Sequence, residues 1–209
     1  MLNRWGRNPL HTIQDFYDAA SAGTLPSVVF VDPPGLGVDQ ADSADEHPPA
    51  DVHVGQKFAS DVVHALFKSP QWKKSALFLT YDENGGVYDH VAPPTACAPD
   101  STPPSLEGAD VGVAGGFDRL GFRVPLVVVS PYAKKGYSAH GTYDHTSITR
   151  FLETKFKVPA LTARDANADP LLDLFDFSAP SFADPPNIPE AIVDPAELTY
   201  CKTTYVKAP

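Results

Sequence analysis

The stretch "ALFLTYDENGGVYDH", residues 76–90, leads from an apolar run into a polar corner. Its first half has the continuous apolar and β-branched composition of a buried strand. Asp82 and Glu83 follow that strand directly, and Gly85 and Gly86 then allow the backbone to turn sharply. The stretch therefore predicts a buried strand that delivers two carboxylates to a tight turn.

Apolar runs and helical periodicity predict further elements on both sides of this stretch. Two more strands are predicted at "SVVFVD" (27–32) and "VPLVVVS" (124–130), and helices at "HTIQDFYDAASAG" (11–23), "VGQKFASDVVHALFKS" (54–69) and "TSITRFLETKF" (146–156). Strands that are apolar throughout and alternate with helices are typical of an α/β fold. We therefore predict a mixed, largely parallel sheet flanked by helices.

Length and composition favour a single main domain followed by a tail. The chain has 209 residues, of which 43% are hydrophobic, enough to bury one sizeable core. Proline becomes frequent after residue 177, so we predict a domain over 1–177 and a proline-rich extended tail over 178–209. Cys97 and Cys201 could form one disulfide that fixes the tail to the domain, or remain two unpaired thiols.

The charge pattern narrows the class of partner. The formal net charge is −10, and no cluster of Lys and Arg occurs along the chain. Nucleic acid is therefore disfavoured as a partner, because phosphate binding depends on concentrated positive charge. A small phosphorylated substrate held by a metal ion remains compatible with this charge. No apolar run reaches the length of a transmembrane helix.

Polar side chains follow the predicted strands at the ends where ligands bind in open α/β sheets. Asp32 ends the first strand, Asp82 and Glu83 end the second, and Ser130 ends the third. Adjacent carboxylates supply the oxygen ligands that divalent cations prefer. The alternative for the second of these ends is an ordinary surface turn, since Asp, Asn and Gly are turn formers.

Three histidines stand beside acids on separate loops. His47 lies in "DEHPPADVH", His90 follows Asp89, and His145 follows Asp144 just before a predicted helix N-terminus. A helix N-terminus attracts anions, and a histidine there can contact a phosphate oxygen or protonate a leaving group. The alternatives are a solvated acidic loop around His47 and ordinary helix capping by Asp144.

The blocks "EHPPADVHVGQKF", "LFLTYDENGGVYDHVAPP", "FRVPLVVVSPYAKKGY" and "YDHTSITRFLETKF" occur in an order that resembles the bacterial phosphoesterase family of phospholipase C and acid phosphatase enzymes, within the alkaline-phosphatase-like superfamily. The resemblance implies metal-dependent hydrolysis of phosphate esters, with a phosphate ester or phospholipid as substrate. It implies a divalent metal ion (Ca, Mg, Mn, Fe or Zn) and export to the periplasm or the cell exterior.

The resemblance also implies roles for particular residues. The metal ligands are Asp82 and Glu83. The catalytic residues are His47, His145 and His90, and the substrate-binding residues are Asn84 and Asp144.

One part of the family pattern is not found in this sequence. The family carries an early Glu-Asn pair in an "ENRSFD"-like motif, followed by a segment with a Ser or Thr nucleophile. We therefore expect the chain to match the C-terminal portion of such an enzyme. Thr80 and Ser130 are disfavoured as substitute nucleophiles. The alternative to an active hydrolase is a catalytically incomplete fragment or non-enzymatic remnant that keeps the fold, and a missing N-terminal portion is then the expected partner.

Overall fold

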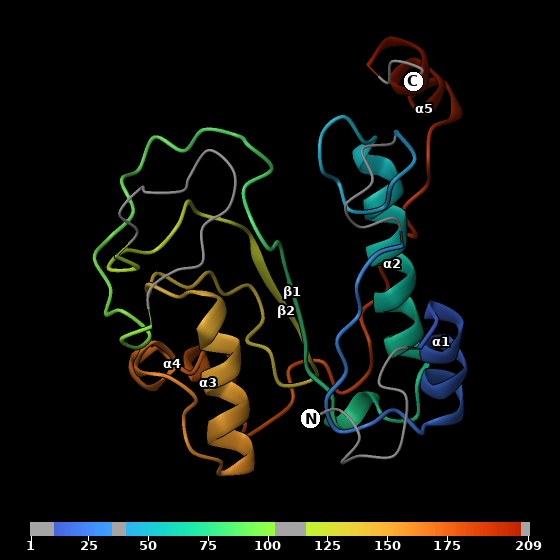
Figure 1. Ribbon diagram of the computed structural model, residues 1–209. Coiled ribbons are helices and arrows are strands. Elements are labelled where there is room, and N and C mark those ends of the chain that lie inside the picture. The colour runs from blue at the N-terminus through green and yellow to red at the C-terminus, as the bar shows by residue number, and fades with distance from the viewer. Residues whose placement is uncertain (1–10, 35–40, 103–115, 206–209) are drawn as a thin grey trace. The chain divides into compact units, whose positions relative to one another are not determined.

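The computed structural model describes residues 11–34, 41–102 and 116–205. The chain forms two compact units, shown with their helices and strands in Figure 1. One unit is Phe78–Ser181. The other comprises the described residues up to Leu77 together with those from Phe182 onward. The described segment from Phe182 onward therefore belongs to the same compact unit as the N-terminal part of the chain.

The N-terminal unit is helical in its described part. It contains helices α1 (Ile13–Ala22), α2 (Val52–Lys68) and α5 (Pro195–Thr204), and the short 3₁₀ helix η2 (Trp72–Lys74). Helices α1 and α2 pack together, as Figure 1 shows. Helix α1 begins at a capping box between Thr12 and Asp15 and ends at Gly23, whose φ of 69° is left-handed. The predicted helix at 11–23 and its end at Gly23 are confirmed.

The core of this unit lies on one face of α2. Val62, Val63 and Leu66 are buried there, and Ala20 of α1 is fully buried. This pattern follows the apolar spacing of the sequence. Trp72 is buried as well, and its indole Nε1 donates to the carbonyl of Phe182 at 3.1 Å.

The predicted extended tail contains helix α5. Pro195 is the first residue of α5, where the missing N–H of proline costs no helical hydrogen bond. Asp194 caps the helix by accepting from the backbone N–H of Ala196. This part of the tail is therefore helical, and proline frequency alone did not indicate it. Both cysteines are free thiols.

The second unit contains the strands. Its elements are β1 (Leu77–Thr80, which starts at the unit boundary), β2 (Leu126–Val129), α3 (His145–Phe156), α4 (Ala163–Asn167) and the 3₁₀ helix η4 (Leu172–Leu174). Helix α3 packs on the sheet, with the rings of Phe78 and Phe151 5.0 Å apart. Phe175 stacks on Phe151 at 5.3 Å and completes an aromatic core.

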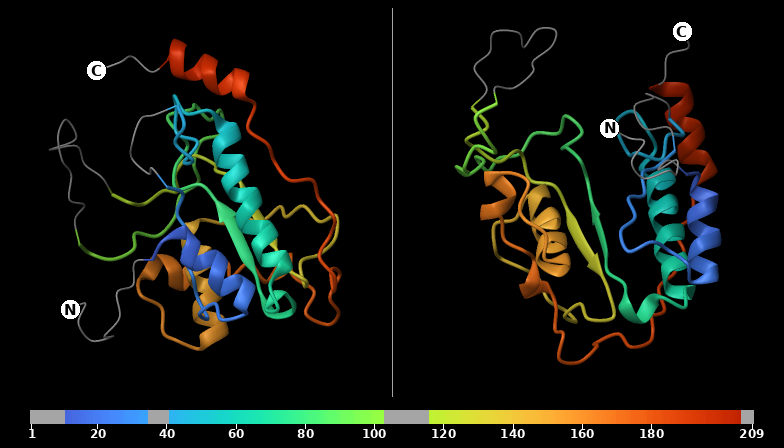
Figure 2. Two further views of the ribbon diagram at one scale, coloured as in Figure 1. Left: turned by 90° about the vertical axis from the view of Figure 1, so that its right-hand side faces the viewer. Right: turned by 60° about the horizontal axis from the view of Figure 1, so that its bottom comes forward.

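The two described strands form a two-stranded sheet and run in opposite directions, as Figure 2 shows. The hydroxyl of Thr80, at the end of β1, donates to the carbonyl of Pro125, just before β2, at 2.9 Å. The combination of helices and strands agrees with an α/β class. The predicted largely parallel sheet is not confirmed, because strand composition does not specify the direction of pairing.

The predicted strand at 27–32 is wrong. The structure assigns no strand to these residues, and Phe30 is 81% exposed. A strand requires a hydrogen-bonded neighbour, and apolar, β-branched composition does not provide one. Asp32, expected at the end of that strand, therefore does not mark a sheet edge in the described part of the chain.

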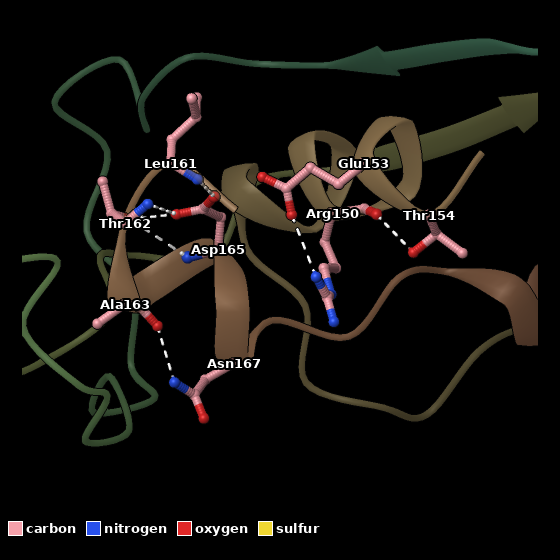
Figure 3. Close-up of polar contacts among 8 residues, drawn as sticks. All are labelled: Arg150, Glu153, Thr154, Leu161, Thr162, Ala163, Asp165 and Asn167. Atoms are coloured by element: carbon pink, nitrogen blue, oxygen red, sulfur yellow. Dashed lines mark hydrogen bonds and ion pairs between the residues drawn. The ribbon is translucent and has the colours of Figure 1, made fainter. Parts of the chain in front are cut away.

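Helices α3 and α4 meet at a group of buried polar side chains (Figure 3). Asp165 is 2% exposed and accepts from the backbone N–H of Leu161 at 2.7 Å and of Thr162 at 2.8 Å. Glu153 is 3% exposed, and its Oε2 accepts a hydrogen bond from Arg150 Nη1 at 3.3 Å. Its Oε1 is buried and has no hydrogen-bond donor among the described residues.

Candidate functional site

The corner after β1 is a tight turn centred on two glycines. Gly85 and Gly86 have φ values of 61° and 73°, as expected for a turn of type I′. The backbone N–H of Val87 donates to the carbonyl of Asn84 at 3.0 Å and closes the turn. The side-chain amide of Asn84 donates back to the carbonyl of Val87 at 2.6 Å. The predicted sharp turn is confirmed, and in this structure Asn84 holds it together.

Asp82 and Glu83 stand at the start of this corner with exposed side chains. Asp82 Oδ1 accepts from the backbone N–H of Glu83 at 3.0 Å, and Glu83 Oε1 accepts from that of Gly85 at 3.0 Å. These contacts orient both carboxylates along their own loop. The two acids are therefore presented as a fixed, solvent-facing pair.

His145 is held against the same corner from the first turn of α3. Its Nε2 lies 2.7 Å from the carbonyl oxygen of Tyr81, the residue before Asp82. A carbonyl can only accept, so Nε2 carries a proton and donates. In the neutral ring the lone pair is then on Nδ1, which fixes the tautomer. The structure thus places His145 against the residue that precedes the Asp82–Glu83 pair. Its Nδ1 can accept a proton or, when protonated, donate one.

Asp144 caps the helix that carries His145. Its Oδ1 accepts from the backbone N–H of Thr146 at 2.7 Å, and its own N–H donates to Ser147 Oγ at 3.2 Å. The alternative from the sequence, ordinary helix capping, is therefore what the contacts of Asp144 show. Its effect on the site is to fix where α3 begins.

Asp89 closes the far end of the corner through a partner that the sequence analysis missed. Arg123 donates to its carboxylate from Nε at 2.9 Å and from Nη2 at 2.8 Å. Hydrogen bonds from the Arg123 guanidinium hold the pKa of Asp89 well below its usual range. His90 is 83% exposed, with Nδ1 3.9 Å from Asp89 Oδ1. Arg123 precedes a predicted strand in a matching block, but nothing in that block indicated its partner.

His47 belongs to the N-terminal unit. Its Nδ1 lies 2.8 Å from the carbonyl oxygen of Pro48, so Nδ1 carries the proton. Its backbone N–H donates to Asp45 Oδ1 at 3.1 Å. These contacts fix the ring within its own loop.

Ser130 is buried, and its Oγ accepts from the backbone N–H of Tyr132 at 3.2 Å. This environment agrees with the expectation that it does not replace the nucleophile.

The donor set does not amount to a complete metal site. In the described part of the chain no three His, Cys, Asp or Glu side chains converge to hold an ion. Asp82 and Glu83 have the right oxygen chemistry, yet two carboxylates are fewer than the six or more oxygens that Ca²⁺ or Mg²⁺ takes. The contacts of the described residues therefore support no step through a metal ion.

Comparison with known proteins identifies the family of the chain. The model of the Phosphoesterase family matches residues 1–159. The chain belongs to the Phosphoesterase family.

Its relatives include named phospholipases from bacteria and plants. Phospholipase C B of Mycobacterium tuberculosis is 37% identical over 199 residues, covering 90% of this chain and 36% of that protein. Non-specific phospholipase C1 of Arabidopsis thaliana is 39% identical over 157 residues, covering 70% and 29%. Non-hemolytic phospholipase C of Burkholderia pseudomallei is 37% identical over 173 residues, covering 76% and 24%.

The matched region is a limited part of these relatives. The chain covers 36% or less of the length of each of these three proteins. In the described part of the chain no helix is both long and apolar enough to cross a membrane.

Proposed function

We propose that the chain takes part in the hydrolysis of phosphate esters as a portion of a phospholipase C-like enzyme. The observation that carries the proposal is the contact of His145 with the backbone at Tyr81, directly before the two corner acids, in a member of the Phosphoesterase family. The names of the relatives support a phospholipid substrate. We propose in addition that this chain is the C-terminal part of an alkaline-phosphatase-like fold. We also propose that the protein is exported from the cell.

His145 is the residue with the clearest chemical role. Cleavage of a phosphate ester requires a proton for the departing oxygen, and a positioned histidine supplies one. The Tyr81 carbonyl occupies Nε2, so proton transfer occurs at Nδ1. The dipole of α3 at the N-terminus beside it favours a bound anion, in addition to the Asp144 carboxylate that caps Thr146.

The remaining assignments stand as proposals. His47 and His90 are proposed to contact the phosphate or support the site, and Asn84 and Asp144 to border the substrate while they hold the turn and the helix cap. Asp82 and Glu83 are proposed as a partial ligand set for a divalent ion whose identity is open. Such an ion would stabilise negative charge on phosphate oxygens.

Hydrolysis of p-nitrophenyl phosphorylcholine and p-nitrophenyl phosphate by the purified 209-residue chain, with and without added divalent cations, tests the proposal. We expect turnover that is lost in Asp82→Ala and in His145→Ala. His140, an exposed histidine on the loop before α3, provides the matched control His140→Ala, which should retain activity. Turnover that survives both site substitutions would overturn the site assignment.

A catalytically incomplete protein that keeps the fold is the second candidate. The specific observation in its favour is that the described residues do not bring three metal-binding side chains together. Absence of hydrolysis from a chain shown to be folded by circular dichroism and cooperative unfolding would select this candidate.

A further inference from the structure

The ion pair between Asp89 and Arg123 joins the candidate site to a segment 34 residues away in sequence. Besides the two guanidinium contacts, the backbone N–H of Arg123 donates to Asp89 Oδ2 at 3.1 Å. The backbone N–H of Val91 donates to Asp89 Oδ1 at 3.1 Å. The Asp89 side chain is only 10% exposed, so its carboxylate is enclosed by these four donors.

This ion pair connects the far end of the corner to the segment just before β2. At the other end of the corner, the hydroxyl of Thr80 donates to the carbonyl of Pro125 at 2.9 Å. Residues 81–88, which include Asp82 and Glu83, lie between the two connections. Within this span, the side chains of Asp82, Glu83 and Asn84 make hydrogen bonds to neighbouring backbone. The Asp89–Arg123 pair therefore adds a long-range constraint at the far end of the corner, as the His145 contact does at Tyr81.

The chemistry of the pair requires arginine. Two nitrogens of one planar guanidinium engage both oxygens of Asp89, so the contact fixes direction as well as distance. A lysine ammonium is a single point charge on a flexible stem and cannot reproduce this fork. The contact with Asp89 therefore requires the planar guanidinium of arginine and not only its positive charge.

We propose that Arg123 is a positioning residue for phosphoester hydrolysis: it acts through Asp89 to fix the corner that carries Asp82 and Glu83, without touching substrate. The inference rests on the proposed function. It assigns a role to Arg123, which the sequence left without one. It also makes Asp89 part of the anchor, that is, of the Asp89–Arg123 ion pair that holds the corner.

The test combines Arg123→Lys, Arg123→Met, Asp89→Asn and the double variant of Asp89→Asn with Arg123→Met. Hydrogen exchange of the amides in residues 82–88 reports the position of the corner without requiring activity, and kcat and KM report the reaction. Arg119→Met is the matched control, because Arg119 lies in the same segment and contacts the carbonyl of Pro93 instead.

If Arg123 positions the corner, the hydrogen-exchange rate of the amides in residues 82–88 should rise about tenfold in all three single variants. The amides of α3 should stay protected. It predicts that kcat falls about 10- to 100-fold with little change in KM, since misplaced groups lose transition-state contacts. The double variant should be no worse than Arg123→Met alone, because both changes break one contact.

Three results would count against these claims, and they can be told apart. Unchanged exchange in Arg123→Met would overturn the anchor. A raised KM in Arg123→Met that Asp89→Asn does not share would show direct contact with substrate and overturn the positioning role. Absence of hydrolysis in the folded wild-type chain would overturn the proposed function, and the exchange data would still decide whether Arg123 holds the corner.

Discussion

Nε2 of His145 donates to the carbonyl oxygen of Tyr81 across 2.7 Å, although the two residues are 64 positions apart. Because the backbone oxygen can only accept, this one contact decides which ring nitrogen is left to exchange protons. The contact joins the first turn of α3 to the residue that precedes Asp82. Both residues belong to the second unit, in which a shared site of His145 and the corner acids is proposed.

The His145 contact predicts a defined tautomer. Nitrogen NMR of the imidazole at neutral pH should show the proton on Nε2 in the neutral ring. Under the proposed function, His145→Gln should lower kcat by about 10²- to 10⁴-fold, because an amide cannot transfer a proton. The His140→Ala control should remain within about twofold of the wild type. A neutral ring with its proton on Nδ1 would contradict the contact.

The buried carboxyl of Glu153 predicts a stabilising substitution. Its Oε1 lacks a donor among the described residues, and its carboxyl interacts with Asp165, itself a buried acid. Glu153→Gln keeps an oxygen for Arg150 and adds an N–H that can face Asp165. We expect the free energy of unfolding to rise by about 1 kcal/mol, the typical value of one hydrogen bond.

Urea denaturation at pH 7 measures the effect of Glu153→Gln. Asp165→Asn is the opposing control: its amide would turn an N–H toward the backbone donors of Leu161 or Thr162, so it should destabilise by about 1–3 kcal/mol. A loss of stability in Glu153→Gln would show that the Glu153 carboxylate is favourable where it lies.

The carboxyls of Asp89 and Asp165 predict a loss of stability in acid. Hydrogen bonds from Arg123 lower the pKa of Asp89. Burial raises the pKa of Asp165, but the hydrogen bonds that its carboxylate accepts from the Thr162 side chain and from backbone N–H groups outweigh this effect and leave the pKa below the ordinary 3.8. The unfolded chain therefore binds protons at a higher pH than the folded chain, and stability falls as the pH drops below about 5.

Unfolding free energies at pH 7, 5, 4 and 3 measure this dependence. Asp89→Asn and Asp165→Asn should each have a shallower slope between pH 5 and 3, because each removes one proton-linked group. A wild-type chain equally stable at pH 3 and pH 7 would contradict the expectation.

The left-handed backbone of Gly86 in the corner predicts a loss of stability when the residue is replaced, even where there is space for a side chain. An added Cβ at Gly86 would meet no atom within 4 Å, yet its φ of 73° is left-handed. Gly86→Ala should therefore destabilise by about 1–2 kcal/mol. Gly86→Asn should cost less than Gly86→Ala, because Asn tolerates this conformation.

Gly121 provides the matched control for the corner glycine. An added Cβ there also meets no atom within 4 Å, but its φ is not left-handed. Gly121→Ala should be neutral or stabilising by up to about 1 kcal/mol. Thermal unfolding of the three variants measures the difference, and equal costs for Gly86→Ala and Gly121→Ala would refute the explanation.

Features that arise from local interactions could be predicted from the amino-acid sequence. Helical spacing, the capping pair of Thr12 with Asp15, and the stop at Gly23 define α1 within one short segment. The Asn84–Val87 turn likewise depends on adjacent residues whose backbone conformation glycine permits. Family membership was also readable, because long blocks of side chains are preserved in order.

Contacts between groups far apart in the sequence became visible only in the folded structure. Residues 27–32 and 126–129 are both apolar and β-branched, yet the structure assigns a strand only to the second. Strand pairing, the donation of His145 to Tyr81 and the pairing of Arg123 with Asp89 all join separate parts of the chain. The composition of one segment does not identify its partner, since packing and hydrogen bonding across the fold make that choice.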